Sequence, residues 1–240
     1  MNERSKYIRR ETIKLMYEHG LQHYGGSLSC IEILIAMYDK VMTKDDIFLM
    51  SKGHCCPPMY VLLREKGFNP EINHHPKFDP ANGINMTSGS LGHGLGFGIG
   101  VALAKKIKGE PGRVFVLMGD GECQEGSTYE SLLIHDKLYL DNLTVIIDHN
   151  LLQGSDFVHN MLPLNQDAIT SAHVDGHDID ALILALYTYH SKEKYPDNHT
   201  QYIFAETYKG YGVSFIKNQV GWHSKMLTEE LYKQAIKELS

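Results

Sequence analysis

The alternation of short apolar runs with longer helical patterns most constrains what this chain can fold into. Apolar runs over residues 113–118, 143–147 and 202–207 predict buried β-strands, and shorter strands are predicted at 46–50 and near His173. A strand that is apolar along its whole length has both faces covered, which is typical of parallel sheets. Helical patterns fall between these runs. The sequence therefore predicts an α/β fold, a doubly wound, mostly parallel sheet flanked by helices.

Helices are predicted where apolar positions recur with helical spacing between turn residues. Ser29, followed three residues later by Glu32, has the spacing of a capping box and predicts a helix start. A loop rich in Pro, Asn and Gly is predicted over 69–89. The expected helices are 4–19, 29–40, one from Pro57, 91–108, 125–140, one from Asp178, and 229–239. No repeat or linker divides the chain, so one domain over residues 1–240 is expected.

Composition argues against several classes of function. The 240 residues are 42% hydrophobic and carry 23 Lys and Arg against 29 Asp and Glu, a net charge of −6. That acidic balance disfavours a nucleic-acid or anionic-membrane partner, and no apolar run reaches membrane-spanning length. The four cysteines form no C-x-x-C pair, so a cytoplasmic protein with reduced thiols is expected. The 14 His and 22 Gly are not needed for a core, which indicates a polar site.

Polar residues stand where two of the predicted strands end. Gly119-Asp120-Gly121-Glu122 follows one strand, and Asp148-His149-Asn150 ends another. In parallel sheets such strand ends form one crevice, which the Asp120 and Asn150 side chains can both face. Their oxygens are hard ligands for Mg²⁺ or Ca²⁺, and Gly121 lets a diphosphate approach the backbone. Each motif alone is more often a surface turn, but together they favour a site.

The extended run "GDGECQEGSTYES…LDNLTVIIDHNLLQ" resembles the thiamine-diphosphate motif of transketolases. It is most similar to the half-length kind, in which the diphosphate-binding half is a separate N-terminal subunit. The resemblance implies that Asp120, Asn150 and the Leu152 carbonyl hold the metal, Mg²⁺ or Ca²⁺. Glu125 matches a catalytic glutamate near the dimer interface and the cofactor's proton relay. The cofactor-binding residues implied within this run are Gly119, Asp120, Gly121, Glu122, Asn150 and Leu152.

Other stretches resemble the same family and supply histidines. His23, in "HYGGS", matches a motif whose His reaches substrate oxygens, and His54, in "FLMSKGH", matches a contact to cofactor phosphate and substrate. His75, followed by Pro76, matches a further site histidine. His223, in "KGYGVSF…GWHS", is placed at the cofactor and substrate. The resemblance thus implies that His23, His75 and His223 are catalytic, with imidazoles suited to stabilising alkoxides or moving protons.

A glycine-rich segment and several departures complete the resemblance. "TSGSLGHGLGFGIGVALA" is similar to the family segment that lies against the cofactor, which implies cofactor contacts for Gly89 and Leu91. A helix that the family usually carries between Asn150 and Val174 is expected to be absent. Ser90 and His93 are variants within the glycine-rich segment. The departures that concern the acceptor substrate more than the cofactor are Tyr24, Lys77 and Ser224.

The remaining motifs do not indicate further functional sites. Zinc binding by histidines is disfavoured because none of the usual close ligand spacings occurs. The glycines at 92–100 give no G-x-G-x-x-G register, which excludes a dinucleotide fingerprint. Cys55 and Cys56 suit packing better than nucleophilic catalysis. His177 is expected to be structural. The histidines left without a role are His19, His74, His135, His149, His159, His190 and His199.

The resemblance implies the diphosphate-binding subunit of a two-chain, thiamine-diphosphate-dependent transketolase-like enzyme. Such an enzyme transfers a two-carbon ketol unit from a ketose to an aldose, either of which is phosphorylated or nucleotide-linked. The expected partner is a C-terminal subunit with the pyrimidine-binding domain, in an α₂β₂ assembly that buries the helix at 91–100. Two alternatives remain open: another thiamine-diphosphate carboligase or decarboxylase acting on an unusual sugar, and a non-catalytic scaffold subunit.

Overall fold

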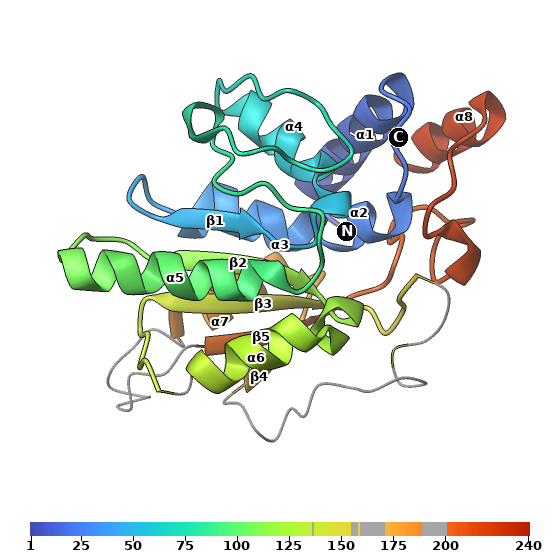
Figure 1. Ribbon diagram of the computed structural model, residues 1–240. Helices are drawn as coiled ribbons and strands as arrows, with labels where there is room; N and C mark the ends of the chain where they lie inside the picture. The colour runs from blue at the N-terminus through green and yellow to red at the C-terminus, as the bar shows by residue number, and fades with distance from the viewer. Residues whose placement is uncertain (136, 155–157, 159–170, 189–200) are drawn as a thin grey trace.

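A five-stranded parallel sheet forms the centre of the computed structural model, which describes residues 1–135, 137–154, 158, 171–188 and 201–240 (Figure 1). The strand order is β1-β2-β3-β5-β4, and every neighbouring pair is parallel. The predicted α/β fold is therefore confirmed. The strands are β1 (Ile47–Met50), β2 (Val114–Gly119), β3 (Leu143–His149), β4 (Ser171–Asp175) and β5 (Gln201–Glu206).

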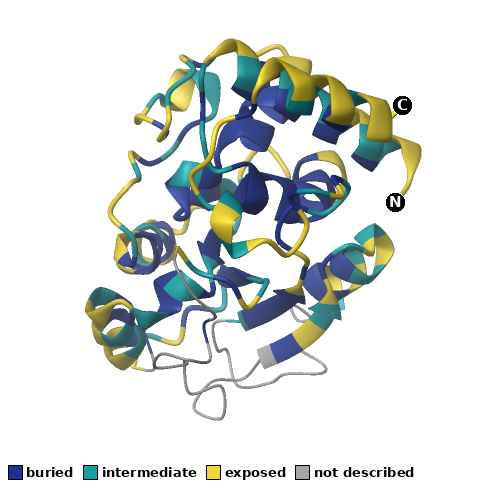
Figure 2. Ribbon diagram, turned by 90° about the vertical axis from the view of Figure 1, so that its right-hand side faces the viewer, coloured by how far each residue is buried: buried dark blue, intermediate teal, exposed yellow. Residues whose placement is uncertain are grey.

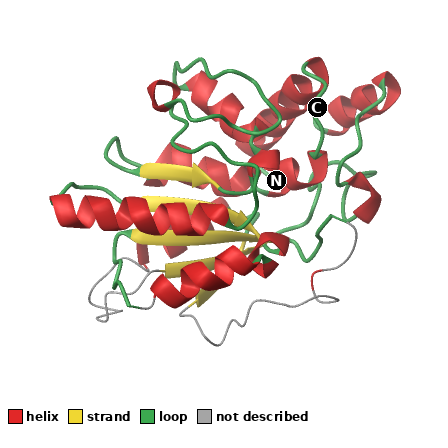
Figure 3. Cartoon of the chain, in the orientation of Figure 1, coloured by secondary structure: helices red, strands yellow, loops and turns green. Residues whose placement is uncertain are grey.

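The register of the central strands carries the polar strand ends to one edge. Val114 lies opposite Leu143, and Gly119 lies opposite Asp148. Both strands are apolar because helices cover both faces of the sheet, as Figure 3 shows. Because the two strands are parallel and Gly119 pairs with Asp148 near their ends, the residues that follow these two lie side by side.

Two helical layers enclose the sheet. One face packs against α5 (His93–Lys108) and α6 (Gly126–His135), and α7 (Ile179–Thr188) packs against β4 and β5 on the other. Buried residues concentrate where the layers meet, and exposed residues lie on the outer sides of the helices (Figure 2). The remaining α-helices are α1 (Glu3–Glu18), α2 (Tyr24–Ser29), α3 (Ile31–Ile35), α4 (Pro57–Glu65) and α8 (Glu229–Glu238).

Short helical turns connect several of these elements. A π-helical segment, Ala36–Val41, continues α3. Within the described parts of the chain, 3₁₀ turns span Gly53–Cys55, Pro80–Asn82, Gly121–Gln124 and Val220–Trp222. None of the helices within the described ranges is both long and apolar enough to cross a bilayer.

The predicted capping box at Ser29 is wrong. Ser29 ends α2, and its hydroxyl donates to the Asp148 carboxylate, 2.6 Å away, and to the Gly26 carbonyl. Glu32 accepts hydrogen bonds from the buried Arg9 guanidinium at 2.5 and 2.6 Å. Both side chains are therefore committed to distant partners rather than to each other. The predicted helix over 125–140 is also too long, because α6 ends at His135.

Glycine at position 94 lets α5 approach the end of β1. A Cβ at Gly94 would overlap the Ser51 side chain and lie 3.0 Å from the Ser51 Cα. Gly100, on the same helix, is exposed and has nothing within 4 Å of where a Cβ would stand. The two glycines therefore have different physical roles, although both belong to one glycine-rich run.

We expect Gly94→Ala to lower the free energy of unfolding by about 2 kcal/mol, the usual cost of overpacking a tight contact. The matched variant Gly100→Ala should raise it by about 0.5–1 kcal/mol, because alanine is the better helix former. Urea denaturation followed by circular dichroism measures both values. Equal effects of the two substitutions would contradict the close approach at Ser51.

Candidate active site

A cavity of about 380 Å³ opens at the carboxyl ends of β1, β2 and β3. All of the residues expected at the site from the sequence line it. Their functional roles remain predictions, but the structure brings them together from seven separate parts of the chain. They are His23, His54, His75, Gly89, Leu91, Gly119, Asp120, Gly121, Glu122, Glu125, Asn150, Leu152 and His223.

Asp120 supplies a buried carboxylate to this cavity. It is only 6% exposed, and it accepts hydrogen bonds from the backbone N–H groups of Gly121, at 2.8 Å, and Leu151, at 2.5 Å. Burial, together with the nearby Asp148 charge, raises the pKa of Asp120 to about 6. Among the described residues no cation forms an ion pair with Asp120. A buried acid of this kind is suited to a bound cation.

Asn150 and Leu152 present further oxygens beside Asp120. The Asn150 side-chain oxygen accepts from the Leu152 N–H at 3.2 Å, and Leu151 between them adopts a left-handed conformation with φ of 63°. The Leu152 carbonyl accepts from Lys209 Nζ at 3.3 Å and keeps a second lone pair. A carboxylate, an amide and a carbonyl form a hard-oxygen donor set that fits Mg²⁺ or Ca²⁺.

Gly121 keeps open the space next to these oxygens. A Cβ there would stand 2.8 Å from the Gln153 Cβ and fill the gap between the two strand-end loops. A bulkier residue would therefore close the cavity where a diphosphate is expected to lie against the backbone. The residues present thus fit both the cofactor's diphosphate and its metal.

Glu122 supports the floor of the cavity. Its two carboxylate oxygens accept from the Ser51 hydroxyl and from the N–H groups of Gly92, at 2.9 Å, and Gly119, at 3.1 Å. Burial raises the pKa of Glu122 above its ordinary value. These bonds join the end of β1, the start of α5 and the end of β2. Glu125, by contrast, is exposed at the start of α6.

Three imidazoles cluster on the other side of the cavity. The ring centroid of His23 lies 5.0 Å from that of His54 and 5.1 Å from that of His223. Burial, with the neighbouring cationic and imidazole groups, lowers the pKa to about 4 for His23, about 2 for His54 and about 4 for His223. These rings are therefore neutral at pH 7. A neutral imidazole offers one N–H donor and one acceptor, which suits it to binding hydroxyl and alkoxide oxygens.

Two lysines in the cavity were missed by sequence reasoning. Both line the cavity. Lys52 and Lys209 each stand directly before a glycine in a stretch that resembles the family, and this position in the sequence could have indicated that they belong to the site. Lys209 Nζ donates to the carbonyls of Leu152 and Gln153 and lies 3.2 Å from His223 Nδ1. The other lining residues that the sequence did not predict are Gly26, Cys55, Gln153 and Gly154.

Lys52 forms a buried ion pair with Asp148 below the cavity. Asp148 also accepts from the hydroxyls of Ser29 and Thr207, and Lys52 donates to the Gly26 carbonyl at 3.1 Å. Burial alone would raise the pKa of Asp148, but the Lys52 ammonium and the two hydroxyls hold it below its ordinary value. The pair therefore stays charged and ties β3 to the segment after β1.

Other candidates from the sequence lie elsewhere or play other parts. Burial raises the pKa of the Cys55 thiol to about 11, which argues against a nucleophile. His177 Nδ1 lies 3.1 Å from Glu32, and its Nε2 accepts from the Tyr208 N–H, in agreement with a structural role. His159, His190, His199 and most of the segment expected to lack a helix lie outside the described residues.

Comparisons with known proteins agree with this geometry. The family described as "Transketolase, thiamine diphosphate binding domain" matches residues 4–239. An apulose-4-phosphate transketolase subunit from Phocaeicola vulgatus is 34% identical, over 98% of this chain and 92% of that protein. The 6-deoxy-6-sulfo-D-fructose transketolase subunit SqwG from a Clostridium species is 30% identical, over 100% of this chain and 96% of that protein.

The fold also resembles solved transketolases. The enzyme from Campylobacter jejuni superposes with a TM-score of 0.83 at 22% identity, over 100% of this chain. This chain spans only 43% of that longer protein. At 22% identity, the structural similarity establishes only a shared fold. Membership of the family is established by the sequence match over residues 4–239. The chain belongs to the transketolase family and carries its thiamine-diphosphate-binding domain.

Proposed function

We propose that this chain is the diphosphate-binding subunit of a two-chain transketolase, which transfers a two-carbon ketol unit from a ketose to an aldehyde sugar. The observation that carries the proposal is one cavity with a hard-oxygen set on one side and neutral imidazoles on the other. Two relatives of nearly the same length are named as subunits of transketolases, which supports a split enzyme.

Asp120, Asn150 and the Leu152 carbonyl would hold a divalent ion, Mg²⁺ or Ca²⁺, and Gly121 would lie against the cofactor's diphosphate. Thiamine diphosphate, when bound, supplies the carbanion and electron-sink chemistry that the reaction needs. The chain's own contribution is to fix the cofactor, to exclude water and to handle protons. Its buried strand-end oxygens serve the first of these tasks.

The histidines would handle the sugar substrates. His23 and His223 are neutral at pH 7, because burial lowers each pKa to about 4. Each ring can therefore donate an N–H to a substrate oxygen, and His23 can also take up a proton at its other nitrogen. His54 would contact phosphate and substrate, and His75, whose pKa is also lowered by burial, lies at the same cavity. Glu125 would face the partner subunit near the cofactor's proton relay.

An apolar hollow beside the cavity would receive the partner subunit. It measures about 760 Å³ and lies between α5 and α6, where Phe97 is 45% and Ile134 57% exposed. Gly92 and Ser127 line the hollow, while Leu91 and Glu125 line the cavity, so the two adjoin at the N-terminal ends of both helices. Exposed aromatic and aliphatic side chains gathered in one hollow indicate a protein interface. We assign it to the pyrimidine-binding subunit of an α₂β₂ assembly, and we place the enzyme in the cytoplasm because its cysteines are free and buried.

The test is reconstitution. The purified chain, with thiamine diphosphate, Mg²⁺ and ketose donors, should show no ketol transfer alone and should become active when mixed with the C-terminal subunit. Phe97→Asp should abolish co-purification and activity, because a charge in the hollow would be desolvated on docking. Ile107→Asp is the matched control, since Ile107 is 76% exposed on the same helix but does not line the hollow.

Ketol transfer by the isolated chain would refute the split-subunit proposal. Cofactor binding by the mixed subunits without transfer to any aldose would favour the scaffold, and release of CO₂ from a keto acid would favour the carboligase alternative.

A further inference from the structure

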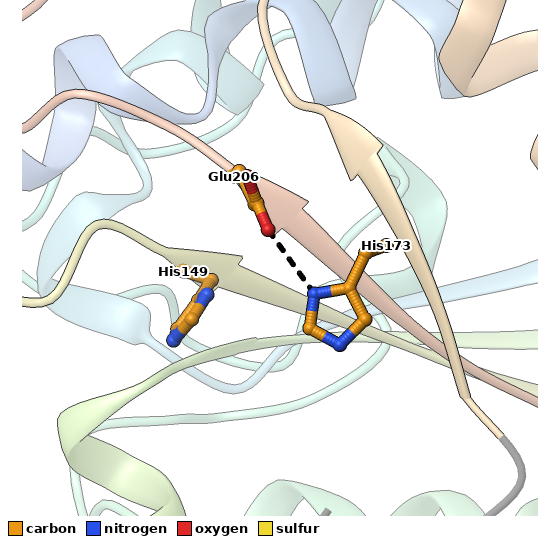
Figure 4. Close-up of side chains that lie close together, drawn as sticks. All are labelled: His149, His173 and Glu206. Atoms are coloured by element: carbon orange, nitrogen blue, oxygen red, sulfur yellow. Dashed lines mark hydrogen bonds and ion pairs between the residues drawn. The ribbon is translucent and has the colours of Figure 1, made fainter.

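His149, His173 and Glu206 form a cluster outside the cavity, on three neighbouring strands (Figure 4). His149 is the last residue of β3, and it lies opposite Glu206, the last residue of β5. His173, on β4, lies opposite Phe204, two residues before Glu206. Because side chains alternate along a strand, these residues share one face of the sheet. Figure 4 shows the Glu206 and His173 side chains pointing toward each other, with His149 on the neighbouring strand.

The three side chains are close enough to share a metal ion. One nitrogen or oxygen of each lies within 4.8 Å of the others, and His173 Nδ1 is already 3.1 Å from Glu206 Oε1. Two ligands of a tetrahedral zinc ion stand roughly 3.4 Å apart when each is about 2.1 Å from the metal. The His173–Glu206 separation is already near this value, and side-chain rotation of His149 would complete the geometry.

Phe204 orients both imidazoles. The His173 ring is stacked on it, with centroids 5.0 Å apart, and the His149 ring meets it edge-on at 5.6 Å. A neutral imidazole keeps one nitrogen lone pair with which it can bind a metal. Glu206 adds a negative charge, which offsets part of the charge of a divalent cation.

We propose that His149, His173 and Glu206 bind a divalent transition-metal ion, best represented by Zn²⁺, with water in the remaining position. Two imidazoles and one carboxylate are borderline ligands of the kind that Zn²⁺ takes. The all-oxygen set at Asp120 differs from them in chemistry. The ion would hold three strands together directly before Asn150 and Thr207, and so would stiffen the edge that carries the cavity.

The experiment titrates Zn²⁺ into the tag-free, EDTA-treated full chain by calorimetry, without any measurement of ketol transfer. Wild type should bind one equivalent at this site, and His173→Ala and Glu206→Gln should each weaken it at least tenfold. Zn²⁺ should also raise the melting temperature of wild type and not that of either variant. The side chains of His173 and Glu206 are 43% and 62% exposed, so neither substitution should impair folding.

Two control variants locate the ion. His19→Ala removes an exposed histidine at the end of α1, and His223→Ala removes one from the imidazole cluster in the cavity. Both should bind Zn²⁺ as wild type does. Loss of the ion in His223→Ala, or equal titration by His173→Ala, Glu206→Gln and wild type, would overturn the proposal. Because the titration needs no partner subunit, its failure would leave the proposed ketol transfer unaffected.

Discussion

Replacing either His23 or His223 by alanine should lower the turnover of the assembled enzyme by about a hundredfold, the usual loss when a positioned acid–base group is removed. Both rings line the cavity, and their centroids lie 5.1 Å apart. The affinity for thiamine diphosphate should change much less, because neither ring contributes to the hard-oxygen set. Steady-state kinetics of the reconstituted enzyme, with calorimetry of cofactor binding, separates the two effects.

His19→Ala is the control for this pair, since it removes an exposed imidazole that does not line the cavity. Its turnover should equal that of wild type. If both cavity variants also kept wild-type turnover, His23 and His223 would have to be regarded as structural residues.

The contact between Lys209 and His223 adds a chemical detail to this expectation. An ammonium group only donates hydrogen bonds, so His223 Nδ1, 3.2 Å from Lys209 Nζ, is the acceptor. The hydrogen of the neutral ring is therefore on Nε2. Lys209 thus positions His223 as an N–H donor, and it also contacts the Leu152 carbonyl of the hard-oxygen set. One side chain links the two halves of the cavity.

The parts of the fold and site that could be predicted from sequence rest on local patterns. The runs that became β2 and β3 are apolar along their length because both faces are buried, and this is visible without a structure. Parallel strands then carry Asp120 and Asn150 to the same edge. The resemblance to a known family added the histidines, which no local pattern distinguishes from structural ones.

The parts that could not be predicted depend on contacts between distant segments. Lys52 and Asp148 are 96 positions apart, and neither residue alone shows that it is buried as half of an ion pair. Ser29 and Glu32 fit a local capping rule, yet buried partners from elsewhere in the chain take both side chains. Zinc-ligand spacing along the sequence likewise cannot reveal the cluster of His149, His173 and Glu206, because each residue comes from a different strand.

Asp120→Ala should weaken the binding of thiamine diphosphate with Mg²⁺ by about a hundredfold, roughly 2.8 kcal/mol, which is near the cost of removing one partner from a buried charge pair. Asp120 is the only charged side chain in the proposed metal-ligand set. Without it, the metal keeps only neutral protein ligands, and the diphosphate's charge is poorly compensated. Calorimetric titration of cofactor and Mg²⁺ into the assembled enzyme measures the loss.

Asp120→Asn separates charge from shape in the same experiment. The amide oxygen can still accept the 2.8 Å hydrogen bond from the Gly121 N–H, but the amide NH2 cannot accept the bond from the Leu151 N–H, and the negative charge is gone. Its cofactor affinity should therefore fall almost as far as that of Asp120→Ala. In the chain without cofactor, the free energy of unfolding should change little, because the loss of the Leu151 hydrogen bond offsets the gain from no longer burying a charged carboxylate. Asp45→Asn is the control, because Asp45 is exposed just before β1, at the opposite edge of the sheet. It should change neither the cofactor affinity nor the free energy of unfolding.

Unchanged cofactor affinity in both Asp120 variants would contradict the assignment of Asp120 as a metal ligand. No other described carboxylate in the cavity is both buried and free of side-chain partners, so the cation would then have to be held elsewhere.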